Sequence, residues 1–186
     1  MKYFNRNYSL EQQQFIDQYA KIIVFEKGTD IIRMGEEVDA FYFMIDGIVR
    51  GYYLDDEGNE ITKCFSYENC FFGSECYRTK KEATYFVGCI EECKCIKLPY
   101  SLIKELALLE PQIEKDIYDL YLKEVEMLEK RTKDLLLLSA EERYLLFCRN
   151  YPNLEHRVPL KMISSFIGIQ AGSMSRIRKK IKKNRN

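Results

Sequence analysis

The sequence predicts an α+β chain with an all-β N-terminal domain, a long connecting helix and a C-terminal pair of short helices. Three observations lead to this prediction. Short runs of β-branched and aromatic residues fill most of the first 100 residues, a heptad spacing follows them, and a basic two-helix pattern ends the sequence. We therefore expect domains at residues 1–110 and 139–186, joined by a helix at residues 111–138.

The N-terminal domain is predicted to begin with a short helix over residues 8–20 and to continue as strands. Turn signals such as Asp46-Gly47 and Glu57-Gly58-Asn59 separate the strand candidates. Regularly spaced short strands with glycine turns are typical of a β-sandwich, a jelly roll or a barrel. The strand candidates are KIIVF, DIIRM, AFYFMI, IVRGYYL, EITKCFSY, ATYFVGCI and CKCIKL.

The connecting helix is expected to run from Pro111 to about Leu138. Its seam residues recur with alternating gaps of three and four, which is the spacing of a two-stranded coiled coil. We therefore expect two copies of the chain to pair along this helix, although a helix packed on its own β domain remains the alternative. The predicted dimer interface consists of Tyr118, Tyr121, Val125, Leu128, Thr132 and Leu135.

The C-terminal segment Val158–Lys183 has the pattern of a helix-turn-helix. Apolar residues recur at helical spacing from Leu160 to Ile167, and Gly168 follows where a helix should stop. A second apolar stripe continues with Met174 and later isoleucines. Upstream, Ser139 and Glu142 have the spacing of a capping box at the start of another helix.

The second helix of this pair is strongly basic on its polar face. Arg176 is the candidate for a base contact, because arginine can pair with both O6 and N7 of guanine. The other DNA-binding candidates share this face, with Gln170 and Ser173 directed at bases and Lys179, Lys180 and Lys183 at phosphates. The alternative is a basic amphipathic helix that binds a membrane surface or an acidic protein.

The charge distribution supports a polyanionic partner for the C-terminal part. Residues 139–186 contain 11 Lys or Arg and three acids, a net charge of +8, whereas the whole chain is neutral, so residues 1–138 carry −8. Basic residues gain binding free energy from DNA because each neutralised phosphate releases condensed counterions. Duplex DNA is therefore the expected partner.

Other function classes find little support in the composition. There is one histidine, and the sequence contains no nucleophile–histidine pairing, phosphate loop or metal-ligand spacing, so we expect no enzyme, no metal site and no cofactor. No run of 18 apolar residues occurs and the polar start lacks a signal-peptide core, so a cytoplasmic protein without a membrane span is expected. Its seven cysteines are then expected to be reduced, with Cys89, Cys93 and Cys95 either core residues or redox sensors.

Several motifs, in this order, resemble those of one family. Phe25–Gly28, Arg33–Glu36, Phe41–Gly47, Asp56–Gly58 and Phe71–Gly73 are similar to the cyclic-nucleotide-binding jelly roll. Ser139–Tyr144, Arg157–Pro159 and Ser175–Lys180 resemble the DNA-binding domain that accompanies it. This order is that of the cyclic-AMP receptor protein and fumarate-nitrate reductase regulator (Crp/Fnr) family. The resemblance implies a jelly-roll fold, a homodimer, a near-palindromic DNA site and RNA polymerase as a partner.

The resemblance also places a candidate effector pocket at Gly73, Ser74, Glu75, Lys81, Ala83 and Thr84. In the family a Phe-Gly-Glu motif and an Arg-Ser-Ala or Arg-Thr-Ala motif hold the nucleotide. Here Ser74 stands at the glutamate position and Lys81 at the arginine position, and lysine cannot make the bidentate phosphate contact of arginine. We therefore expect a transcription regulator that does not bind cyclic AMP and is controlled by another effector or by the thiol state of its β domain.

Overall fold

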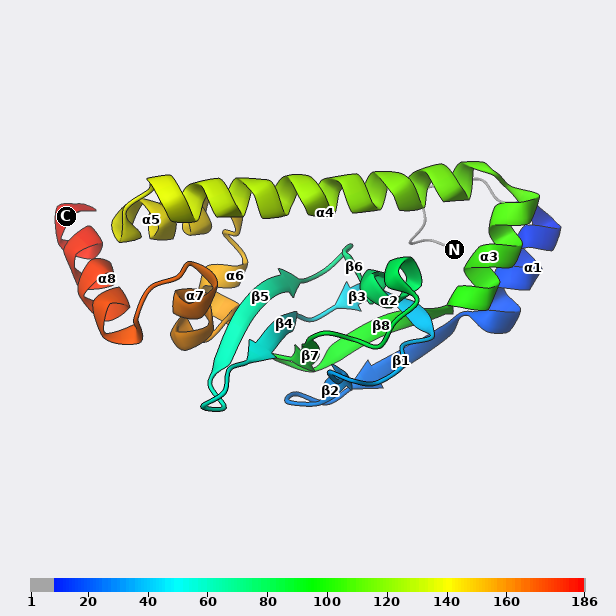
Figure 1. The fold of residues 1–186 in the computed structure, drawn as a ribbon, viewed down its shortest axis with the longest axis horizontal. Coiled ribbons are helices and arrows are strands. Elements are labelled where there is room, and N and C mark those ends of the chain that lie inside the picture. The colour runs from blue at the N-terminus through cyan, green and yellow to red at the C-terminus, as the bar shows by residue number, and fades with distance from the viewer. Residues whose placement is uncertain (1–8, 186) are drawn as a thin grey trace. The chain divides into compact units, whose positions relative to one another are not determined.

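The computed structural model describes residues 9–185, apart from the side chains of Gln12, Phe15, Ala171 and residues 182–185. The chain forms two units (Figure 1). The first consists of residues up to 53 together with 63–118, and the second of residues 54–62 together with 119–186. The second unit therefore combines the end of a β-hairpin with the C-terminal helices.

The first unit is an antiparallel β-sandwich, which confirms the predicted all-β domain. One sheet has the strand order β1-β8-β3-β6, and the other has the order β2-β7-β4-β5. Strand pairing is antiparallel at β1–β8, β3–β8, β3–β6, β2–β7 and β4–β7. The strands are β1 (Lys21–Phe25), β2 (Asp30–Ile32), β3 (Ala40–Asp46), β4 (Val49–Leu54), β5 (Glu60–Ser66), β6 (Phe71–Phe72), β7 (Phe86–Cys89) and β8 (Cys93–Pro99).

The core of the sandwich lies where alternate residues of the two sheets meet. Along β8, Cys93 and Cys95 are fully buried while Lys94 between them is exposed, as the two-residue period of a strand requires. The turn from β3 to β4 packs closely on this core. Gly47 has a φ of 105°, and a Cβ atom there would lie 2.5 Å from the Glu92 carbonyl oxygen. Only glycine fits this turn.

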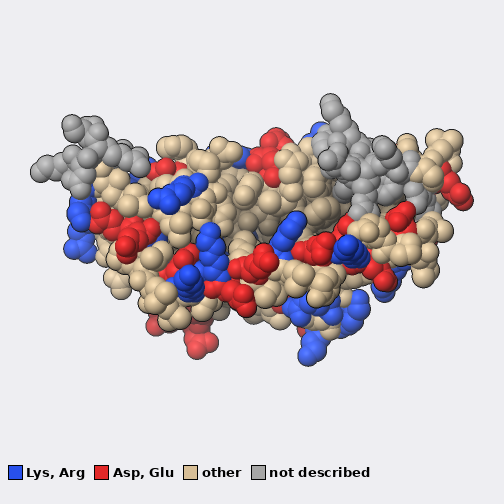
Figure 2. All heavy atoms as spheres, turned by 90° about the horizontal axis from the view of Figure 1, so that it is seen from above, with Lys and Arg blue, Asp and Glu red and all other residues tan. Residues whose placement is uncertain are grey.

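Among the described residues, the first unit contains the helices α1 (Leu10–Tyr19), α2 (Ser74–Thr79) and α3 (Tyr100–Leu109). The long helix α4 (Gln112–Leu137) then runs for 26 residues and begins and ends within one residue of the predicted bounds. Its predicted seam is mostly apolar and largely exposed in the single chain, with Val125 49% and Leu128 46% exposed. Figure 2 shows the molecule turned by 90° from Figure 1, and on that face acidic and basic side chains are interspersed with uncharged ones. None of the helices in the described part of the chain is long and apolar enough to cross a membrane.

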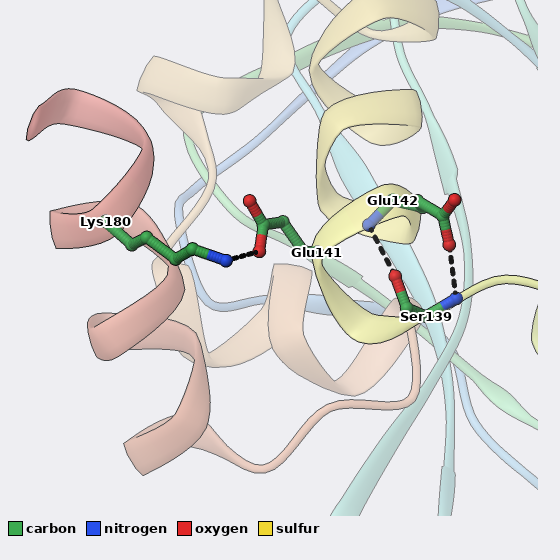
Figure 3. A network of polar contacts seen from close by, with 4 residues as sticks. All are labelled: Ser139, Glu141, Glu142 and Lys180. Carbon is green, nitrogen blue, oxygen red and sulfur yellow. Dashed lines mark hydrogen bonds and ion pairs between the residues drawn. The ribbon is translucent and has the colours of Figure 1, made fainter. Parts of the chain in front are cut away.

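The second unit contains four further helices after α4, namely α5 (Ala140–Asn150), α6 (Leu154–Arg157), α7 (Leu160–Phe166) and α8 (Ala171–Arg185). The predicted capping box is present at the start of α5. The Ser139 Oγ accepts a hydrogen bond from the Glu142 amide at 3.3 Å, and the Glu142 carboxylate accepts one from the Ser139 amide at 2.8 Å (Figure 3). The short helix α6 was not predicted, because four residues are too few to show a periodicity.

Candidate nucleic-acid interface

Helices α7 and α8 are joined by a tight turn at the predicted glycine. Gly168 adopts a φ of 67° directly after α7, and the Ile169 amide donates to the Ser164 carbonyl oxygen at 2.9 Å. A left-handed residue after the last turn is the usual way to end a helix. A Cβ atom at Gly168 would also lie 2.9 Å from Leu135 Cδ2. The left-handed backbone conformation therefore favours glycine at this turn, while the end of the Leu135 side chain could move aside for a Cβ atom.

The two helices pack through the apolar stripes that the sequence predicts. Ile163 of α7 and Met174 of α8 are 1% and 0% exposed, and Ile169 of the turn is buried between the helices. Ile177 and Ile181 are half-buried one and two turns further along α8. Since the apolar side of α8 faces its own unit, its polar side faces away from this core.

The polar side of α8 carries the predicted DNA-binding residues. Gln170, Arg176, Lys179 and Lys180 are exposed, and Ser173 is half-buried. Arg176 Nη2 donates to Ser173 Oγ at 3.2 Å, so these two candidates lie side by side on one turn of the helix. The side chain of Lys183 lies outside the part that the structure describes. The described candidates thus form one accessible, basic surface.

Lys180 has a partner that the sequence did not reveal. Its Nζ lies 2.6 Å from Glu141 Oε2, in the first turn of α5 (Figure 3). The two residues are 39 positions apart, so no local pattern indicates the pair. A phosphate-binding candidate is therefore held by a carboxylate of its own unit.

The other two acids of residues 139–186 are also engaged. Glu142 caps α5, while Glu155 Oε1 accepts a hydrogen bond of 2.7 Å from the buried Tyr144 hydroxyl. This hydrogen bond is the main cause of the lowered pKa of Glu155, and the positive charge of Arg178 adds to it. Burial and then the same hydrogen bond raise the pKa of Tyr144. Glu141 thus forms an ion pair with a cation of α8, whereas Glu142 and Glu155 accept hydrogen bonds from Ser139 and Tyr144.

Two arginines satisfy carbonyl groups at the end of α7, where the helix leaves them without backbone donors. Arg143 Nε donates to the Ile167 carbonyl oxygen at 2.7 Å and its Nη2 to that of Gly168 at 3.2 Å. Arg131 Nη2 donates to the Phe166 carbonyl oxygen at 2.9 Å, with its guanidinium over the Phe166 ring. Neither role is visible in the sequence, because α4 and α5 supply these side chains from 35 and 24 residues away along the chain.

Arg131 also reaches the β-hairpin end that belongs to the second unit. Its Nη2 donates to the Thr62 carbonyl oxygen at 3.1 Å, and the Thr62 amide donates to Ser165 Oγ at 2.8 Å. The hairpin end, α4 and α7 are therefore connected by hydrogen bonds through two side chains. Beside them, α4, α5 and α7 line an open pocket of about 490 Å³, whose lining includes Met127, Leu135, Leu146, Phe147 and Phe166.

The candidate effector residues lie at α2 and the segment that precedes β7. Glu75 and Thr84 are in direct contact, since Thr84 Oγ1 donates to Glu75 Oε1 at 2.7 Å. Ser74 and Ala83 are buried, whereas Lys81 is exposed. Gly73 has a φ of 84°, and a Cβ atom there would lie 2.8 Å from the Ala40 carbonyl oxygen. The structure thus brings Glu75 and Thr84 together and gives Ser74 a place in the interior.

The candidate redox thiols lie in the core of the sandwich. Cys93 and Cys95 are 0% exposed, and all seven cysteines are free in the described residues. The Cys93 Sγ donates to the Ile48 carbonyl oxygen at 3.3 Å, and the Cys95 Sγ lies 3.6 Å from Met44 Sδ. Burial raises the pKa of the Cys95 thiol to about 12, and a hydrogen bond with Cys93 raises that of Cys89. Within the described residues, no His, Cys, Asp and Glu group suits a metal ion.

Comparisons with known proteins agree with this architecture. Residues 22–108 match the family model of the cyclic nucleotide-binding domain. The chain is 22% identical over 181 residues to the fumarate and nitrate reduction regulatory protein of Vibrio cholerae, covering 87% of this chain and 70% of that protein.

Two solved structures share the fold with a TM-score of 0.80. FixK2 from Bradyrhizobium japonicum is 17% identical, with 89% of this chain and 85% of that chain covered. A putative transcriptional regulator of the crp/fnr family from Eubacterium rectale is 15% identical, with 99% and 89% covered.

The matched β domain and the long helix define a transcription regulator with a domain of the cyclic nucleotide-binding type. Over most of its length the chain is similar to regulators of the Crp/Fnr family. The resemblance drawn from the sequence motifs is thereby confirmed, and so is the prediction of a regulator rather than an enzyme.

Proposed function

We propose that the protein is a homodimeric regulator that binds specific DNA sequences, with α7 and α8 as its helix-turn-helix. The observation that carries this proposal is the two-sided character of α8. Met174 is completely buried on one side, whereas Arg176 and Lys179 are exposed on the other. In a helix-turn-helix the second helix enters the major groove with such an exposed polar side. A membrane-binding helix would instead need an exposed apolar side.

Individual side chains on α8 take different roles in this proposal. Arg176 contacts a base edge, with Gln170 and Ser173 as neighbours that add to the reading of sequence. Lys179, Lys180 and Lys183 contact phosphates, which position the helix without reading sequence. The net charge of +8 on residues 139–186 attracts the duplex, and the acidic remainder of the chain orients the approach.

The homodimer forms along α4. The predicted seam exposes Tyr118, Val125 and Leu128 in the single chain, and pairing would bury this apolar stripe against its copy. Two copies of α8 would then enter successive major grooves about 34 Å apart, on a near-palindromic site. The protein would act in the cytoplasm, and RNA polymerase would be its partner at the promoter.

The β-sandwich supplies the control in this proposal. Cyclic AMP is not the effector, because Lys81 replaces the phosphate-binding arginine and the Glu75 carboxylate already accepts hydrogen bonds from Thr84. A different effector, or the state of Cys89, Cys93 and Cys95, would shift the dimer between two arrangements of its reading helices. A calorimetric titration that finds micromolar cyclic AMP binding would contradict the proposal that cyclic AMP is not the effector.

Binding-site selection with the full-length protein tests the proposed function. Selection from duplexes of random sequence should yield one near-palindromic motif. The affinity of the protein for this motif should fall steeply as the salt concentration rises. Repeating the selection in reducing and oxidising buffers tests the thiols, with the Cys93→Ser and Cys95→Ser double variant as the control. If that variant responds to oxidant as the wild type does, these two thiols are only core residues. Salt-insensitive binding of a protein or membrane without any selected sequence would favour an interaction module instead.

A further inference from the structure

The Lys180–Glu141 pair places a negative charge where DNA should come. Lys180 lies on the flank of the basic surface of α8, and its side chain is 62% exposed. Glu141 is 32% exposed and contacts the Lys180 ammonium at 2.6 Å (Figure 3). The carboxylate is well placed in the first turn of α5, because the positive end of a helix dipole favours an acid there.

We propose that Glu141 competes with DNA phosphate for Lys180 and thereby weakens binding to DNA of any sequence. The inference rests on the proposed DNA-binding function. A carboxylate and a phosphate oxygen are both anionic acceptors of hydrogen bonds from an ammonium group. When a duplex docks on α8, Lys180 must exchange Glu141 for a phosphate, or Glu141 must stay and repel the backbone.

A purely structural role for the pair explains less. An ion pair this exposed contributes little to stability, since solvent screens it. The apolar packing of Met174, which is 0% exposed, holds α8 on its unit without help from Lys180. Glu155 accepts a hydrogen bond from the Tyr144 hydroxyl instead, at 2.7 Å. Glu141 thus neutralises Lys180, whereas Arg176 donates a hydrogen bond to the neutral hydroxyl of Ser173.

The Glu141→Gln variant tests the proposal. It keeps the size of the side chain and removes its charge. Its affinity for a duplex of random sequence should rise about two- to fivefold at low salt, the range that exposed ion pairs span. The plot of log affinity against log salt should steepen by about 0.9, because one more phosphate is neutralised. Fluorescence anisotropy over a salt series measures both quantities.

Glu142→Gln is the matched control, because it removes the same charge one residue away. The Glu142 side chain points to Ser139 and not to Lys180 (Figure 3), and glutamine can also complete a capping box. This variant should bind random DNA as the wild type does. The gain from Glu141→Gln should also vanish in a Lys180→Ala background. Equal gains in both glutamine variants, or a gain that survives Lys180→Ala, would show a general charge effect and overturn the proposal.

The other outcomes are also decisive. Weaker binding by Glu141→Gln, with circular dichroism unchanged, would mean that Glu141 positions α8 and would overturn the proposal. An unchanged affinity would overturn it as well, while leaving the DNA-binding function intact. If the wild type itself binds no duplex at any salt concentration, the proposed function fails. Glu141→Ser provides the same comparison if the glutamine variant does not fold.

Discussion

The Arg143 Nε atom donates a hydrogen bond of 2.7 Å to the carbonyl oxygen of Ile167. The same guanidinium donates through Nη1 to the Leu138 carbonyl oxygen at 2.6 Å and through Nη2 to that of Gly168. One side chain therefore joins the end of α4 to the turn that precedes α8. Because arginine presents its donors in a rigid fork, this contact holds the turn in one orientation.

Arg143→Ala should lower the free energy of unfolding of the second unit by about 1.5–3 kcal/mol, the range for hydrogen bonds to charged groups. Arg143→Lys should recover only part of this loss, because an ammonium cannot span three carbonyl groups. Urea unfolding followed by circular dichroism measures the change. Arg149→Ala, an exposed arginine on the same helix, is the control. Equal stability of the two alanine variants would contradict the role given to Arg143.

The capping box at α5 should make stability depend on pH. Hydrogen bonds from the Ser139 hydroxyl and then its backbone amide hold the pKa of Glu142 below its ordinary value of 4.5. A carboxyl with a lowered pKa in the folded state contributes stability above its ordinary pKa, and this contribution is lost as the pH falls through the lowered value. Thermal unfolding from neutral pH to below pH 4.5 should therefore show a loss of stability that is smaller in Glu142→Gln.

Removing the cap side chain should also cost stability at neutral pH. Ser139→Ala should destabilise the protein by about 1 kcal/mol at neutral pH, the usual cost of losing an N-cap side chain. Ser139→Asp, which retains an acceptor at this position, should restore most of the stability. If Ser139→Ala unfolds at the same temperature as the wild type, the contacts of Ser139 with Glu142 do not stabilise α5.

The α4 seam should decide the oligomeric state. Replacing Val125 and Leu128 by lysine would place like charges along the paired helices, so the double variant should sediment as a single chain. Leu122→Lys is the control, because Leu122 is 44% exposed but lies off the seam. Analytical ultracentrifugation distinguishes the states. A wild type that is monomeric at all concentrations, or a double variant that still dimerises, would place the interface elsewhere.

Arg176 and Lys179 should differ in what they contribute to DNA binding. Arg176→Ala should cost about 1–3 kcal/mol on the preferred site and relax the selected motif at one base position. Lys179→Ala should weaken binding to all sequences alike, and it should lower the slope of log affinity against log salt by about one. Binding-site selection with each variant gives the comparison. An unchanged motif with Arg176→Ala would refute the assigned base contact.

Several parts of the fold could be predicted because they depend on residues close together in the sequence. The capping box at Ser139, the turn at Gly168 and the shared face of Cys93 and Cys95 follow from spacings of two to four residues or from one conformation. Helical and strand periods translate such spacings directly into faces. The bounds of α4 followed in the same way from Pro111 and a heptad spacing.

Contacts between distant residues could not be predicted in this way. Lys180 and Glu141, or Arg143 and Ile167, come from different helices, and no spacing in the sequence indicates that they meet. The candidate pocket shows the same limit. Its residues were located by motif, but only the fold shows that Thr84 donates to the Glu75 carboxylate while Lys81 is exposed.

Sequence alone was sufficient for the basic polar side of α8 and for the apolar stripe opposite it, because a helix turns a repeat in sequence into a face in space. Tertiary packing decided which cations on that helix remain available to a partner. Once the stripe is buried, the approach of α5 brings the Glu141 carboxylate to Lys180, whereas Arg176 stays exposed beside Ser173. The sequence of a helix sets the charges along it, but the helix that packs beside it decides which of those charges have an ion-pair partner.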